Sequence, residues 1–148
     1  MTTKTDLTID ISIANRFIFG GKAYFTLISK KTNRAYSYLI HRKDNNPFWF
    51  VYVKENSVFN YAGFIRICQD RYIYDVGSRG KYGAEDNRII TLMWFLTHME
   101  DNDINSKIII AHEGHVARCC KCGKLLTDVE SIRRGAGVEC AKIVFGGR

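Results

Sequence analysis

The sequence predicts an α+β protein: an antiparallel sheet of about five strands with one packed helix, followed by a small C-terminal treble-clef-like zinc module. Three observations predict it. Runs rich in aromatic and β-branched residues fill positions 23–76, one segment of helical periodicity follows residue 85, and H-V-A-R-C-C-K-C-G-K-L-L at 115–126 clusters three cysteines. We expect the sheet and helix in residues 1–106 and the zinc-binding module, packed on them, in residues 107–148.

The strands are predicted in chain order from their alternation and their separators. Apolar and polar residues alternate from Leu7 to Ile13, which is the period of a half-buried strand, and Gly20 and Gly21 then interrupt the pattern. Polar and turn-forming residues separate the β-rich runs that follow, as is typical of hairpins. These runs are A-Y-F-T-L-I-S, A-Y-S-Y-L-I-H, F-W-F-V-Y-V-K, G-F-I-R-I-C and R-Y-I-Y-D-V.

A helix is predicted after the sheet, because Ile89, Leu92, Met93 and Leu96 recur at helical spacing behind the acidic start A-E-D-N. We expect it to lie across the sheet and to run to about Glu100. The stretch K-I-I-I-A then predicts a short strand that leads into the cysteines, and E-C-A-K-I-V-F predicts a second helix.

The cysteine spacing predicts a structural metal site. Cys119 and Cys122 have two residues between them and precede Gly123, as in a zinc knuckle, where backbone N–H groups point at both sulfurs. Cys140 begins the predicted second helix, whose N–H groups stabilise a thiolate. Three sulfurs need a fourth ligand: we prefer His115, which is nearer to the knuckle, with His112 as the alternative. The expected cofactor is one structural Zn²⁺ per chain.

Other interpretations of the cysteines are weaker. A redox C-x-x-C pair would need a βαβ context, and an odd count of five cysteines in a cytoplasmic setting disfavours disulfides. Cys120 should point away from a knuckle built on its neighbours, and Cys68, within a predicted strand, should be a small core residue. H-E-G-H is one residue short of the H-E-x-x-H protease motif.

The C-terminal stretch C-C-K-C-G-K-L-L-T-D-V-E-S-I-R-R-G-A-G-V-E-C-A resembles the signature of a family of small bacteriophage-encoded proteins of unknown function. That signature reads C-x-x-C-G-R-x-L-T-x-P-x-S-I-x-x-G-I-G-P-x-C, and this chain departs from it at Lys124, Val129 and Val138. The family form H-E-G-x-C is lengthened here by three residues, which leaves both histidines open as ligands. The resemblance implies a phage-encoded protein in the host cytoplasm, for which nucleic-acid binding is the usual presumption.

The charge pattern favours an anionic partner. The formal net charge is +7, and the 28 residues from Arg16 to Lys43 contain seven basic side chains and no acidic one. Tyrosines such as Tyr24 and Tyr38 could stack bases, although we favour their packing under the helix. The candidate contacts to a nucleic-acid backbone are Lys30, Lys31, Arg34, Arg42, Arg133 and Arg134.

Together these features predict a phage-encoded, zinc-containing nucleic-acid-binding accessory protein, with DNA favoured over RNA as its partner. The alternative is a protein-binding inhibitor of a host defence or replication complex. A treble-clef nuclease ranks low because no Asn/His/Asp set accompanies the histidines, so we expect no enzyme. The N-terminus carries no apolar signal segment and no apolar run is long enough to span a bilayer, which predicts a cytoplasmic protein without a membrane partner. The oligomeric state is not predicted.

Overall fold

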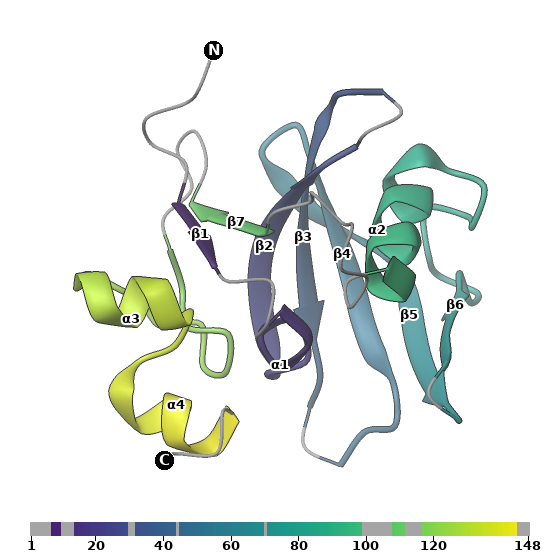
Figure 1. Cartoon of the computed structure of the whole chain (residues 1–148). Helices are drawn as coiled ribbons and strands as arrows, with labels where there is room; N and C mark the ends of the chain where they lie inside the picture. The colour runs from purple at the N-terminus through teal and green to yellow at the C-terminus, as the bar shows by residue number, and fades with distance from the viewer. Residues whose placement is uncertain are drawn as a thin grey trace.

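The computed structural model describes residues 7–9, 14–29, 32–43, 45–69, 71–98, 108–111 and 117–144, with only the backbone described at 7–9, 14, 108–111, 129 and 133. The described strands form one sheet in the order β1-β7-β2-β3-β4-β5-β6 (Figure 1). The strands are β1 (Leu7–Ile9), β2 (Lys22–Ile28), β3 (Ala35–His41), β4 (Trp49–Glu55), β5 (Val58–Cys68), β6 (Arg71–Asp75) and β7 (Ile108–Ala111). The helices are α1 (Ala14–Ile18), α2 (Asn87–His98), α3 (Val129–Arg134) and α4 (Val138–Val144).

The five consecutive strands β2 to β6 pair antiparallel, each with the next, and confirm the predicted fold class. Strand β5 begins at Val58, inside the stretch that the sequence assigned to a separator, and its register slips between Val51 and Tyr52 of the paired strand. The predicted short strand K-I-I-I-A is β7, which pairs with both β1 and β2. The sheet therefore extends beyond the hairpin series by two short strands from distant parts of the chain.

The helix α2 covers one face of the sheet (Figure 1), as predicted. Its apolar side is buried, with Ile89, Leu92, Phe95 and Leu96 each at most 2% exposed. Below it, the fully buried Tyr38 donates a 2.7 Å hydrogen bond from its hydroxyl to the carbonyl oxygen of Arg88. This contact confirms that Tyr38 packs under the helix, because the ring supplies apolar area and the hydroxyl finds a partner.

The aromatic residues divide between the two faces of the sheet. Tyr24 lies opposite Leu39 in the ladder and Phe25 lies opposite Tyr38, so Tyr24 and Tyr38 point to opposite faces. The expectation that Tyr24 packs under the helix was therefore wrong: it lies on the face away from α2, where its ring centroid is 5.6 Å from that of Phe59.

Cys68, expected in the core, is exposed. The expectation was wrong because Cys68 is the last residue of β5, opposite Arg71 beside the hairpin turn, where residues 66–69 are all exposed.

The N-terminal segment also departs from its prediction. Leu7–Ile9 form a strand as expected, positions 10–13 lie outside the described residues, and the helix α1 follows where no helix was expected. This five-residue helix is too short to be stable alone, and burial of Phe17 and Ile18 holds it on the sheet. Among the described residues, no helix is long and apolar enough to cross a membrane.

Candidate metal centre and the adjoining cleft

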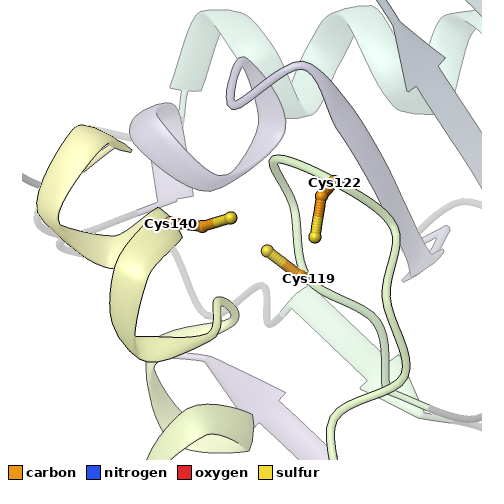
Figure 2. A group of neighbouring side chains, drawn as sticks. All are labelled: Cys119, Cys122 and Cys140. Carbon is orange, nitrogen blue, oxygen red and sulfur yellow. The ribbon is translucent and has the colours of Figure 1, made fainter.

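Three cysteines converge beside the sheet. The sulfur atoms of Cys119, Cys122 and Cys140 lie within 4.8 Å of one another, and Figure 2 shows the three side chains pointing toward a common centre. Two come from a tight turn and the third from the first turn of α4. Sulfurs that share a tetrahedral zinc at Zn–S distances of about 2.3 Å stand about 3.8 Å apart. The three sulfurs therefore have the spacing of a metal site, and they supply three of the four ligands of a tetrahedral ion.

Backbone hydrogen bonds build the knuckle. The Cys119 amide donates to the Lys124 carbonyl, the Gly123 amide donates to the Cys119 carbonyl, and both bonds measure 2.8 Å. Gly123 adopts a φ of 78°, and a Cβ there would lie 3.0 Å from Cδ of Lys22. The left-handed turn therefore favours glycine, and a Cβ would also require the Lys22 side chain to shift.

The second half of the module places Cys140. Asp128 caps α3 by accepting a 2.9 Å hydrogen bond from the Ser131 amide, and Gly135 ends the helix with a φ of 77°. The chain then turns directly into α4, so Cys140 falls in the first helical turn, as the sequence predicted. The helix α3 was not predicted, although the Asp128 cap was visible in the sequence as D-V-E-S.

The sulfurs influence one another's ionisation. Burial raises the pKa of Cys119, but N–H groups of Cys122, Gly137 and Lys121 more than offset it, so that this pKa is lowered from its usual value. Burial and hydrogen bonds with Cys119 and Cys122 raise the pKa of Cys140 to about 12. One thiolate is thus readily formed, whereas a second is penalised by low solvation and by the first. A bound divalent cation would remove this penalty.

Cys120 stands apart from this group, as predicted. It is fully buried, and burial together with the charge of Cys119 raises its pKa to about 12. Its amide donates to the Gly135 carbonyl at 2.9 Å, and its carbonyl accepts a 2.7 Å hydrogen bond from the Lys22 amide. Cys120 therefore ties the knuckle to α3 and to the sheet at once.

A cleft of about 660 Å³ adjoins the cysteine cluster. Its walls come from α1, the Gly20–Gly21 turn, the connection between β3 and β4, the knuckle and the end of α4. Four cationic side chains line it, and no carboxylate does so among the described residues. These cations are Arg16, Arg42, Lys43 and Lys121.

Of the predicted nucleic-acid contacts, Arg42 alone lines the cleft among the described side chains. Arg34 is exposed in the turn between β2 and β3, at the opposite end of β2, about 20 Å away by the length of the strand. Arg134 bonds within its own helix, donating from Nη2 to Ser131 Oγ at 3.2 Å. The positions that the structure does not describe are Lys30, Lys31, His112, His115 and the side chain of Arg133.

The sequence did not single out three cleft cations. Arg16 and Lys43 are the first and last residues of the run that contains no carboxylate. That run indicated a basic surface, but it did not predict which of its seven cations lie together in the folded protein. Lys121 was not among the predicted contacts. Its position beside Arg42 follows from the docking of the knuckle against the Gly20–Gly21 turn.

The comparison with protein families places one match on this module. The model of a family of unknown function (DUF6011) matches residues 110–145, which include the three clustered cysteines and the helices α3 and α4. The strands β1 to β6 and the helix α2 lie outside the matched segment. No curated protein and no solved structure matches the chain.

Proposed function

We propose that this protein is a zinc-containing nucleic-acid-binding accessory protein of a bacteriophage, with DNA favoured over RNA. The observation that carries the proposal is the convergence of Arg16, Arg42, Lys43 and Lys121 on one cleft that no described carboxylate lines. Cationic side chains gathered in a concave site focus a positive potential, which favours an anionic ligand.

Electrostatics at the same end of the sheet agrees with this proposal. Burial, followed by the nearby charges of Lys22 and Lys43, lowers the pKa of His41 from its usual value. A proton is thus disfavoured at His41 partly because the surroundings are already positive. A phosphate backbone is a partner with the complementary charge.

The proposed metal is one structural Zn²⁺ per chain, held by Cys119, Cys122 and Cys140 with His115 as the fourth ligand and His112 as the alternative. Three thiolates and a neutral imidazole complete a closed tetrahedral set, which suits a structural role. The site would carry a formal charge of −1. Arg118, whose Nη1 donates to the Gly123 carbonyl at 2.9 Å, stands beside the knuckle and offsets that charge.

The metal would also fix two walls of the cleft. Lys121 lies between two of the ligands in the sequence, and Ile143 and Val144 follow Cys140 by about one helical turn. We therefore expect nucleic-acid binding to depend on metal loading, although no cleft residue needs to touch the metal.

The test is a binding titration with a fluorescent oligonucleotide at several salt concentrations, in DNA and in RNA. Each neutralised phosphate contributes a slope of about 0.7–0.9 in log K against log salt. The double variant Arg42→Ala and Lys121→Ala should lower the slope by the contribution of one or two phosphates. Arg79→Ala, an exposed arginine in the turn after β6, is the matched control and should change nothing.

Zinc content, measured on each variant, separates a lost contact from a lost module. Equal binding by the wild type and the double variant would show that the cleft is not the interface. Absence of binding to any nucleic acid would place an inhibitor of a host protein complex first, to be sought by purification from host lysate.

A further inference from the structure

The cleft is lined by more than cations. Two carboxamides, two aromatic rings and two aliphatic side chains share it with the four charges. They are Asn15, Asn45, Phe19, Trp49, Ile143 and Val144. Contacts to phosphate alone would need only the cations, whereas amides and flat or apolar surfaces are the groups that contact the edge and the faces of a base.

The two aromatic rings of the cleft, Phe19 and Trp49, pack against other rings, and Arg42 lies over one of them. Phe19 stacks on Tyr72 with ring centroids 5.4 Å apart, and meets Trp49 edge-on at 5.0 Å. Trp49 is only 8% exposed, and Arg42 Cζ lies 4.9 Å from the centroid of its ring. Arg42 is therefore held over the ring of Trp49, and a planar guanidinium is a group on which a base can stack.

Asn15 is held in position for hydrogen bonding. Its Nδ2 donates to the Tyr72 hydroxyl at 3.1 Å, which orients the carboxamide. A carboxamide has two N–H hydrogens and an acceptor oxygen, so one hydrogen and the oxygen remain for the edge of a base. Asn45 adds a second carboxamide from the exposed turn between β3 and β4.

The size of the cleft decides between a strand and a duplex. A volume of about 660 Å³ lies within the range of about 300–1,000 Å³ that suits one small ligand. A duplex keeps its bases stacked inside and cannot insert one without extruding it, at a cost of a few kcal/mol. A single strand carries no such pairing cost, because its bases can unstack and turn outward.

We propose that the cleft binds one unstacked nucleotide, with its phosphate among the four cations and its base against Arg42, so that the protein prefers single strands to duplex. This inference rests on the proposed function and assigns the ligand of the same cleft. The shared chemistry is a base with a phosphate, which a free nucleotide or a nucleotide within a strand can supply.

The experiment uses the full-length zinc-loaded protein carrying Trp94→Phe, which leaves Trp49 as its single tryptophan. The probes are a mononucleotide, a single strand of about four nucleotides and a blunt hairpin duplex, at one salt concentration. The short strand should quench Trp49 fluorescence and bind at least about tenfold more tightly than the duplex, a difference of about 1.4 kcal/mol. A mononucleotide that binds as tightly as the strand would support the site and identify a free nucleotide as its ligand.

Two variants test the base contacts. Asn15→Ala and Asn45→Gly remove the carboxamides, and glycine also suits the positive φ of 62° at Asn45. Each substitution should lower the affinity for the single strand by several-fold and leave the affinity for the duplex unchanged. If the protein binds strand and duplex with equal affinity, and neither variant changes either affinity, the nucleotide site is overturned while the proposed function is not. A protein that binds neither nucleic acid would overturn both.

Discussion

Gly20 and Cys120 touch across the boundary between the sheet and the cysteine module. A Cβ at Gly20 would lie 2.8 Å from the Cys120 sulfur and 2.9 Å from its carbonyl oxygen. The same carbonyl accepts the amide of Lys22, so the module docks directly on backbone rather than through long side chains. A contact of this kind leaves no room for adjustment.

Gly20→Ala should therefore destabilise the protein. Overpacking of this kind costs about 1–3 kcal/mol, because the backbone of Cys120 must move. For a chain of this size each 1 kcal/mol lowers Tm by roughly 2–4 °C, which a thermal melt followed by circular dichroism would measure. Gly137→Ala is the control, since a Cβ there meets nothing within 4 Å; it weakens only the N-cap of α4 and should cost no more than about 1 kcal/mol. Equal melting of the two variants would contradict the docking contact.

Neighbouring cysteines should respond differently to the same change. Cys119→Ala should lose the metal, because it removes a sulfur of the cluster. Cys120→Ala should retain one zinc per chain and lose about 1 kcal/mol through the small cavity left by a fully buried side chain. Elemental analysis of freshly purified protein, paired with a melt, would check both. Metal retained by the first variant or lost by the second would refute the ligand assignment.

Tyr38→Phe should lower the free energy of unfolding by about 0.5–1.5 kcal/mol. The substitution keeps the buried ring and removes the hydrogen bond to the Arg88 carbonyl, which anchors the start of α2. Urea denaturation at constant m-value would measure the loss. Nucleic-acid affinity should not change, since this ring lies beneath the helix. A fall in affinity at unchanged stability would instead place Tyr38 in the interface.

Acidification should destabilise the fold through His41. Its folded-state pKa lies below the usual 6.5, first through burial and then through Lys22 and Lys43. Between the folded and unfolded pKa values the unfolded chain binds more protons, so stability rises with pH in that window. The stability is fully present above about pH 6.5 and is lost as pH falls through the folded pKa.

His41→Gln should flatten this part of the pH profile. The comparison is the difference in urea midpoint between wild type and variant at pH 7.5 and pH 5.5, because any acid effect on the metal ligands is common to both proteins. An identical acid-induced shift in the two proteins would rule out a contribution from His41.

The sequence predicted the elements whose signals are local. Strands β2 to β6 follow alternating apolar runs with turn residues between them, and α2 follows its apolar period, so both appeared near their expected places. The sulfur cluster was predicted for the same reason, since the spacing of two cysteines and a helix start fixes most of its geometry. By contrast, α1 is stabilised by the tertiary burial of Phe17, and no local sequence pattern predicts such a contact.

The cleft could not be predicted because it is assembled from distant segments. Arg16, Arg42 and Lys121 are far apart in the chain and meet only when α1, the end of β3 and the knuckle are docked. The count of charges along the sequence identified the basic run, but it gave Arg34 and Arg42 equal standing as candidate contacts. Strand β3 separates them, since Arg34 directly precedes its first residue and Arg42 directly follows its last.

The position of β7 between β1 and β2 constrains the order in which the chain can fold during synthesis. The hairpins β2 to β6 contact near neighbours in sequence and can form as they leave the ribosome. Strand β1, although made first, pairs with β7 and must wait for almost the last quarter of the chain. Until then the outer edge of β2 offers unpaired N–H and C=O groups to other chains, so the late closure by β7 is also a protection against aggregation of nascent protein.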